Sequence, residues 1–294
     1  MLKGIFPPIT TPFINDEIAF DKLAENLNKW NSTGLSGYVV MGSNGESAFL
    51  TREEKLKLVE EVKNNSAKDK LIIAGTGSDS IRETISLTNE TAKKGADYAL
   101  ILTPSFFKEK MDETSLINYF TMVADSVDIP VIIYNVPKYT VVNIEAPAVS
   151  VLSKHKNIAG IKSSSENIAH LSELIFNSPK NFVTLVGTAS VLYPGLVVGA
   201  AGGVLALANI APAECLNIQA LYNRNKNEEA LKLQCRMIPA NRAVTGKYGV
   251  AGLKAAMDLL GYFGGNPRAP LSRLNEIQLN DLKNILAKAE ILQE

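Results

Sequence analysis

The amino-acid sequence predicts an α/β fold, namely a (β/α)8 (TIM) barrel with a C-terminal helical extension. Eight short apolar runs recur along the chain up to residue 207, and longer segments with charges at helical spacing separate them. The runs are continuous and not alternating, which is typical of parallel strands covered on both faces. Eight strand–helix units in this length match the barrel, and an open doubly wound sheet is the alternative that the pattern leaves open.

The expected strands are 4–10, 37–41, 70–74, 98–102, 131–135, 158–162, 183–187 and 203–207. Helix signals lie between them. Thr51 and Glu54 form a capping box, which predicts a helix start. Asp79 is the expected N-cap of a helix that runs toward Gly95, a natural residue to end it. Two more barrel helices are expected at 113–126 and 165–176.

Beyond the last strand the pattern is helical only. The expected helices are 213–222, 227–243, 250–260 and 278–292. We therefore divide the chain into a catalytic barrel domain, 1–224, and a helical extension, 225–294.

Composition excludes several classes of protein. Thirty basic and thirty acidic residues cancel, so neither a nucleic-acid partner nor a membrane-surface role is expected. The uncharged run 181–213 is long enough for a membrane span, but glycines and a proline divide it into strand and short-helix lengths. Two cysteines and an N-terminus without a secretory pattern favour a cytoplasmic protein.

The sequence has few residues or motifs that could bind a metal ion or a nucleotide. His155 and His170 are the only histidines, and no Cys/His spacing resembles a zinc site. The segment 75–80 lacks the third glycine of a dinucleotide fingerprint, and there is no Walker A string. We expect no cofactor and no metal.

In a barrel, the active site lies at the carboxyl ends of the strands. That rule selects the loop 42–46, the loop 103–107, the strand ends Tyr134 and Lys162, and two further strand ends at 187–188 and 208–209. The candidate catalytic residues are Lys162 and Tyr134, and the candidate substrate-binding residues are Gly42, Ser43, Asn44 and Gly187.

Lys162 follows the apolar run 158–161, which would hold its amine at the mouth of a dry barrel. Desolvation disfavours an ammonium ion and leaves a free nucleophile, as a Schiff-base lysine requires. Alternatively, Lys162 merely reaches water at a strand end. Tyr134 is either a proton-transfer group or a core aromatic residue. Loop 42–46 either directs backbone N–H groups at an anion or is an ordinary turn.

Three motifs in this order resemble the dihydrodipicolinate synthase and N-acetylneuraminate lyase family, and the similarity extends over essentially the whole chain. They are Gly-Ser-Asn-Gly-Glu at 42–46, Tyr-Asn-Val-Pro at 134–137 and Ile-Lys at 161–162. The resemblance implies a barrel aldolase in which Lys162 forms an imine with pyruvate or another 2-oxo acid. It implies that Tyr134 shuttles protons and that Ser43 and Asn44 hold the carboxylate. It also implies a homotetramer built as a dimer of dimers.

Within the family, five positions depart from the dihydrodipicolinate synthase pattern. Ser43 and Asn44 stand where two threonines are typical, Tyr139 stands where an arginine is typical, and Phe106 and Phe107 replace a tyrosine pair. The 42–46 motif and several C-terminal motifs are similar to 4-hydroxy-2-oxoglutarate aldolases. The first expectation is therefore a lyase that releases pyruvate from a hydroxylated 2-oxo acid or a deoxy-sugar acid. The alternatives are condensation of pyruvate with aspartate semialdehyde and non-catalytic binding of a 2-oxo acid.

Overall fold

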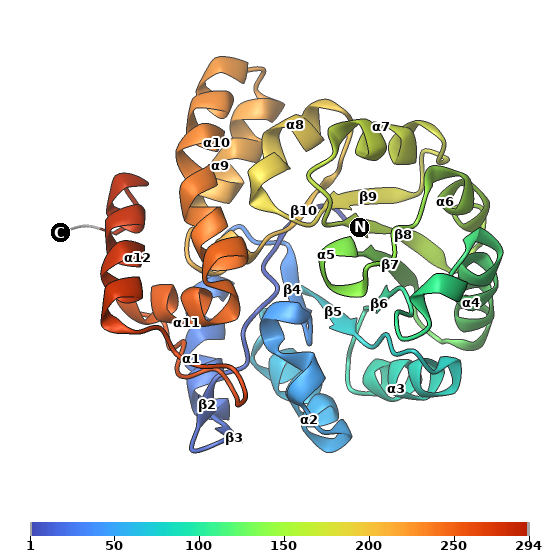
Figure 1. Cartoon of the computed structure of the whole chain (residues 1–294), viewed down its shortest axis with the longest axis horizontal. Coiled ribbons are helices and arrows are strands. Elements are labelled where there is room, and N and C mark those ends of the chain that lie inside the picture. The colour runs from blue at the N-terminus through green and yellow to red at the C-terminus, as the bar shows by residue number, and fades with distance from the viewer. Residues whose placement is uncertain (1, 293–294) are drawn as a thin grey trace.

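The computed structural model describes residues 2–292, in which eight parallel strands form one barrel ringed by helices (Figure 1). The strands are β1 (Gly4–Phe6), β4 (Gly37–Val40), β5 (Leu71–Gly75), β6 (Tyr98–Leu102), β7 (Val131–Asn135), β8 (Ile158–Ser163), β9 (Val183–Val186) and β10 (Gly202–Val204). All eight expected strands are confirmed. The first and the last are shorter than expected, because the regular pairing of β1 with β10 ends at Phe6 and Val204. Residues 206–209, expected in part as strand, form a 3₁₀ turn.

The barrel closes between the segment after β1 and β4. Pro8 pairs in parallel with Val39, the Ile9 N–H donates to the Val39 carbonyl, and the Val39 N–H donates to Pro7. The other strands are hydrogen-bonded in chain order, from β4 to β10 and then to β1. The two edges of the sheet therefore meet, and the open doubly wound alternative is wrong.

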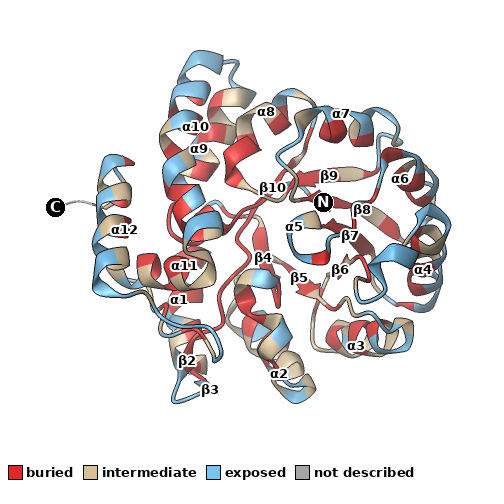
Figure 2. Cartoon of the chain, in the orientation of Figure 1, coloured by how far each residue is buried: buried red, intermediate tan, exposed pale blue. Residues whose placement is uncertain are grey.

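The barrel interior is filled by inward-facing apolar side chains from nearly every strand, so it is a packed core and not a channel. Figure 2 shows the strands as buried along most of their length. The interior cluster is Leu2, Phe6, Val39, Ile73, Leu100, Ile132, Tyr134, Val136, Leu185 and Val204.

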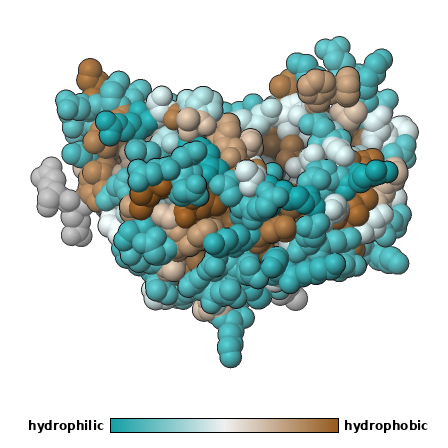
Figure 3. Space-filling view, turned by 90° about the horizontal axis from the view of Figure 1, so that it is seen from below, coloured by the Kyte–Doolittle hydropathy of each residue, from teal (hydrophilic) through white to brown (hydrophobic). Residues whose placement is uncertain are grey.

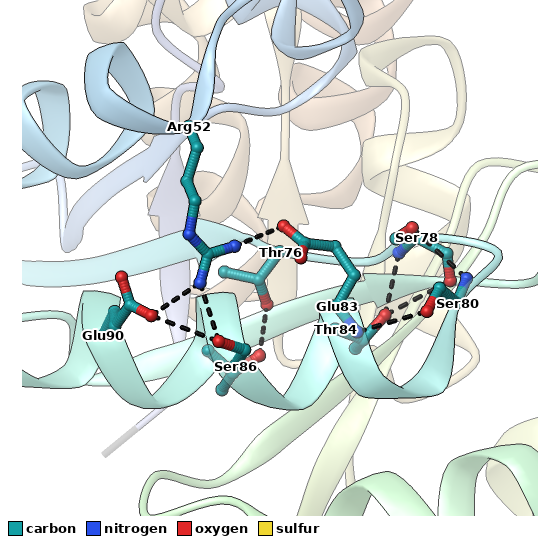
Figure 4. Close-up of polar contacts among 9 residues, drawn as sticks. Arg52, Thr76, Ser78, Ser80, Glu83, Thr84, Ser86 and Glu90 are labelled. Carbon is teal, nitrogen blue, oxygen red and sulfur yellow. Dashed lines mark hydrogen bonds and ion pairs between the residues drawn. The ribbon is translucent and has the colours of Figure 1, made fainter.

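Helices cover the outside of the barrel. They are α1 (Phe20–Asn31), α2 (Arg52–Asn65), α3 (Ile81–Lys93), α4 (Glu113–Ser126), α6 (Ala146–Leu152), α7 (Ile168–Phe176), α8 (Leu192–Val197) and α9 (Pro212–Asn223). The short α5 (Pro137–Thr140) follows the carboxyl end of β7 and lies over the barrel, inside the ring of the other helices (Figure 1). The capping box of Thr51 and Glu54 is confirmed at the start of α2. Arg52 on α2 pairs with Glu83 and Glu90 on α3, which ties the two neighbouring helices together (Figure 4).

The expected cap of α3 is wrong by one residue. Ser80 is the N-cap, and its hydroxyl accepts a hydrogen bond from the Glu83 N–H. Asp79 instead accepts hydrogen bonds from the N–H groups of Ser105 and Phe106 at 2.6 and 2.9 Å, so its carboxylate joins two loops at the carboxyl ends of the strands. The expected end of the helix at Gly95 is confirmed by its positive φ of 100°.

A small antiparallel hairpin, β2 (Phe13–Ile14) and β3 (Glu17–Ile18), lies between β1 and α1, and the sequence analysis does not predict it. Its two turn residues, Asn15 and Asp16, both have positive φ, which is the geometry of a tight two-residue hairpin turn. The strands are too short for an alternating pattern to be visible in the sequence.

The C-terminal extension consists of α10 (Asn227–Arg242), α11 (Gly249–Leu259) and α12 (Glu276–Lys288). It lies to one side of the barrel, with α12 outermost (Figure 1). The expected helices are confirmed, although the last ends four residues early, at Lys288. The division of the chain into two domains at residue 224 stays a prediction. No helix among residues 2–292 is both long enough and apolar enough to cross a membrane.

Arg268, which follows α11, anchors the extension to α2. Its guanidinium donates to both carboxylate oxygens of Glu54, at 2.6 and 2.8 Å. This hydrogen bonding with Arg268 holds the pKa of Glu54 below its ordinary value of 4.5. A depressed folded-state pKa means that the stabilisation is complete above pH 4.5 and is lost as the pH falls through the folded-state pKa.

We therefore expect Glu54→Gln to lower the free energy of unfolding by about 1 kcal/mol at neutral pH, because it removes a bidentate pair. The difference between the variant and wild type should shrink below pH 4.5. Urea unfolding at a series of pH values measures it. A difference that stays constant from neutral to acidic pH would show that the pair contributes nothing through its charge.

Candidate active site

Strand register places Lys162 and Tyr134 side by side inside the barrel. Lys162 on β8 is paired with Tyr134 on β7 and with Leu185 on β9. Residues in register on parallel neighbours point to the same face, and Tyr134 and Leu185 belong to the interior cluster. The Lys162 side chain therefore points inward, at the carboxyl end of the strands where barrel active sites lie.

The Lys162 amine is buried without a charged partner. The residue is 3% exposed, and its Nζ lies 3.8 Å from the centre of the Tyr134 ring. Within residues 2–292 no carboxylate lies within 4.0 Å of this nitrogen. A buried amine without a counter-ion has the environment expected of a nucleophile.

Tyr134 connects the amine to the loop after β4. Its hydroxyl lies 3.4 Å from the Ser43 hydroxyl. Burial acts to raise the pKa of Tyr134, but the Lys162 charge and hydrogen bonding with Ser43 outweigh it, so the pKa is below its ordinary value. A phenol that gives up its proton more readily beside an amine is suited to proton transfer.

The loop after β4 forms a short 3₁₀ turn over Ser43–Gly45. The N–H groups of Gly45 and Glu46 donate to Gly42 and Ser43 within the turn, which leaves the N–H groups of Ser43 and Asn44 for a ligand. Glu46, which ends the turn, has a positive φ of 55°. Strained backbone of this kind persists where the surroundings hold it, often at functional sites.

Gly187 lies where two loops approach closely. A Cβ at this position would lie 2.0 Å from the Ser164 hydroxyl oxygen, so no side chain fits without movement. The neighbouring Thr188 accepts a hydrogen bond from the Asn241 side chain at 2.9 Å, which fixes the loop against α10.

These side chains surround one cavity of about 250 Å³. Five of the six sequence-predicted site residues line it: Ser43, Asn44, Tyr134, Lys162 and Gly187. Gly42 does not line it and lies buried at the start of the turn, near Pro8 and Val39.

Other strand ends selected from the sequence do not reach the cavity. Loop 103–107 and the pair 208–209 are not among its lining residues. Asn209 has a structural role, because its amide donates to the carbonyls of Pro8 and Ala206.

The sequence analysis missed the cavity residues that come from helices and distant loops. These are Lys138, Ser164, Glu166, Arg242, Thr245 and Gly246. A signal was present only for Lys138, which neighbours the Tyr-Asn-Val-Pro motif. Across the described chain, no three His, Cys, Asp or Glu side chains gather in a way that could hold a metal ion.

A family model described as the dihydrodipicolinate synthetase family matches residues 1–289. The chain belongs to this family. Its members are aldolase-type carbon–carbon lyases, so the expected enzyme class is confirmed.

Similarity to individual relatives agrees with this family assignment. The chain is 37% identical over 290 residues to the 4-hydroxy-tetrahydrodipicolinate synthase of Methanothrix thermoacetophila, covering 98% of this chain and 97% of that one. The dihydrodipicolinate synthase of Bacillus anthracis has a TM-score of 0.94 at 28% identity, with 98% of each chain covered. A prophage protein of the family from E. coli K12, solved in complex with pyruvate, has a TM-score of 0.93 at 27% identity, with 99% of each chain covered.

The names of these relatives bear on the choice of reaction within the family. The relatives whose names state an activity are named synthases and not 4-hydroxy-2-oxoglutarate aldolases.

Proposed function

We propose that the protein is a 4-hydroxy-tetrahydrodipicolinate synthase, which condenses pyruvate with aspartate semialdehyde through an imine at Lys162. The observation that carries the proposal is the buried Lys162 amine, without a carboxylate partner, at a cavity next to Tyr134. Relatives at 33–37% identity that carry this name over nearly their whole length support the choice of reaction.

In the proposed reaction, the Lys162 amine attacks C2 of pyruvate, and the carbonyl oxygen leaves as water after protonation. Loss of a proton from C3 gives an enamine, whose C3 attacks the aldehyde carbon of the second substrate. The ammonium group of that substrate then loses a proton, and the free amine attacks the imine carbon, which closes the ring and releases Lys162. Tyr134 carries the protons, and the Ser43 hydroxyl 3.4 Å away continues the path.

The direct test is an assay with pyruvate and aspartate semialdehyde, coupled to a reductase that consumes the product. We expect turnover that depends on both substrates. Pyruvate that forms an imine without any turnover would contradict the proposal and favour the non-catalytic binding protein.

A second candidate is the lyase that releases pyruvate from a hydroxylated 2-oxo acid. Tyr139 favours a deoxy-sugar acid as its substrate, since such an acid has no second carboxylate and Tyr139 lines the cavity without the charge that an arginine would bring to one. A panel of 4-hydroxy-2-oxoglutarate and deoxy-sugar acids, followed by pyruvate release, separates the two candidates. Pyruvate release from one of these acids that is faster than the condensation of pyruvate with aspartate semialdehyde would overturn the synthase proposal.

Tyr134→Phe should reduce turnover by about 10²-fold or more, because general acid–base groups contribute on this scale. The fold should be retained, because the ring stays in the core. Steady-state kinetics measure the effect, and Tyr98→Phe is the matched control, since Tyr98 begins β6 at the opposite end of the barrel. Unchanged turnover in Tyr134→Phe would assign the residue to the core alone.

We further propose a cytoplasmic homotetramer. Figure 3 shows hydrophobic side chains at several separate places on a largely hydrophilic face. Phe106 and Phe107 are 79% and 69% exposed and pack edge to face, 5.0 Å apart, in a loop that two hydrogen bonds to Asp79 hold in place. Large exposed aromatic groups of this kind are typical of subunit contacts. Sedimentation equilibrium should give four times the mass of the chain, and a monomer would contradict the proposal.

A further inference from the structure

Three charged side chains line the same cavity as Lys162 but lie at its exposed rim. Lys138 comes from α5, Glu166 from the segment after β8, and Arg242 from the end of α10. All three are exposed, and none forms an ion pair within the described part of the chain. The cavity therefore has two cations and one anion at its mouth, and its bottom holds the amine.

The end of α10 is held firmly at this rim. The Asn241 amide donates to the hydroxyls of Thr188 and Ser190, both at 2.9 Å, which joins the helix to the loop after β9. The chain then makes a π-helical turn over Ala243–Lys247, within which the Thr245 hydroxyl bonds back to the Asn241 carbonyl at 2.6 Å. Such turns are rare and are frequent at functional sites. Arg242 is the residue between these two anchors.

Lys138 is joined to the same turn from the other side. Its Nζ donates to the Thr245 carbonyl at 3.3 Å, across more than a hundred residues of sequence. One neutral carbonyl does not neutralise the ammonium ion. Lys138 and Arg242 therefore both line the cavity beside this turn, and their two positive charges are available to an anion that binds there.

We propose that this rim recognises the amino-acid end of the acceptor aldehyde: Arg242, helped by Lys138, binds the carboxylate, and Glu166 binds the ammonium group. The inference rests on the proposed function and deepens it. We take the pyruvate carboxylate to bind at Ser43 and Asn44, as the family resemblance implies, so the rim charges are left for the second substrate.

The charges at the rim are complementary to those of an acceptor with a carboxylate and an ammonium group. A guanidinium group binds a carboxylate through two parallel hydrogen bonds, so Arg242 supplies what Tyr139, at the position typical of arginine, lacks. An acceptor with a carboxylate alone would leave Glu166 unpaired beside a second negative charge. An acceptor with both a carboxylate and an ammonium group pairs with all the charges at the rim. The Glu166 carboxylate, left unpaired by an acceptor without an ammonium group, then weakens the binding of that acceptor.

The test uses two acceptors that differ only in the ammonium group, aspartate semialdehyde and succinate semialdehyde. The constants measured are KM for aspartate semialdehyde, the inhibition constant of succinate semialdehyde competing with it, and KM for pyruvate. Arg242→Gln should raise KM for aspartate semialdehyde and the inhibition constant of succinate semialdehyde by about tenfold or more, the scale of one charge-assisted hydrogen-bonded pair. Glu166→Gln should raise KM for aspartate semialdehyde, and it should lower or leave unchanged the inhibition constant of succinate semialdehyde.

Neither change should alter KM for pyruvate or imine trapping at Lys162 by more than about twofold, and Arg242→Lys should restore part of the binding. Arg224→Gln, an exposed arginine after α9, is the matched control and should change nothing. A wild-type enzyme that turns over aspartate semialdehyde, with variants that bind both acceptors as it does, would overturn the inference alone. A wild-type enzyme inert toward this substrate pair would overturn the proposed function and the inference with it.

Discussion

Lys162→Met should abolish condensation, with turnover reduced by about 10³-fold or more, because methionine keeps the length and packing of the side chain but cannot form an imine. The residue is almost fully buried in the barrel interior, so an apolar replacement removes a desolvated amine without opening a cavity. The thermal unfolding midpoint should therefore stay at or above that of the wild type.

Coupled kinetics and thermal unfolding measure both expectations on one preparation. Lys154→Met is the matched control, since Lys154 is an exposed lysine in the turn before the same strand. A Lys162→Met protein that is folded and keeps a tenth or more of the wild-type turnover would show that the amine is not the nucleophile.

The second large effect concerns a buried ion pair next to the turn over Ser43–Gly45. Glu46 Oε1 and Lys254 Nζ are 2.5 Å apart, an ion pair without the alignment of a hydrogen bond, and both side chains are at most 1% exposed. Glu46 also accepts a hydrogen bond from the Arg268 N–H at 2.8 Å, and Lys254 donates to the Asn266 carbonyl at 3.0 Å. The pair thus joins the turn at 43–45 to the C-terminal extension.

Burial lowers the pKa of Lys254, and the attraction of Glu46 acts in the opposite direction. Lys254→Met would leave the Glu46 carboxylate buried and unpaired, which should cost about 3–5 kcal/mol of unfolding free energy. The double change Glu46→Gln with Lys254→Met should recover a large part of that loss, because no buried charge remains. KM for pyruvate should rise in both variants, since the turn loses its anchor.

Urea unfolding of the wild type, both single variants and the double variant gives the coupling energy as a double-mutant cycle. A Lys254→Met protein within about 1 kcal/mol of the wild type would contradict this account of the pair. Retained stability together with a raised KM would instead assign the pair to positioning the turn.

The sequence predicts the barrel well because parallel strands leave a strong local pattern. Each strand is buried on both faces, so each appears as an apolar run, and the strand ends indicate where Lys162 and Tyr134 lie. The β2–β3 hairpin has too few residues for such a pattern. The cap of α3 is misjudged because Asp79 and Ser80 are both good N-cap residues, and only the contacts of Asp79 with the next loop decide between them.

The rim of the site could not be predicted for a different reason. Arg242 and Thr245 reach the cavity through the packing of α10 against the loop after β9, and Glu166 reaches it from an exposed loop. None of these three residues belongs to a sequence motif, because their positions at the cavity arise only from the folded structure. The first expectation of a lyase came from Tyr139 together with the 42–46 and C-terminal motifs, and none of these indicates that Arg242 and Glu166 line the cavity.

Every step of the proposed reaction depends on an imine between Lys162 and pyruvate. Borohydride reduction in the presence of pyruvate, followed by peptide mass mapping, detects that imine. We expect one reduced pyruvate adduct, on the peptide that contains Lys162, and no such adduct in Lys162→Met. An adduct on another lysine, or a protein that turns over pyruvate with no adduct at all, would contradict this expectation.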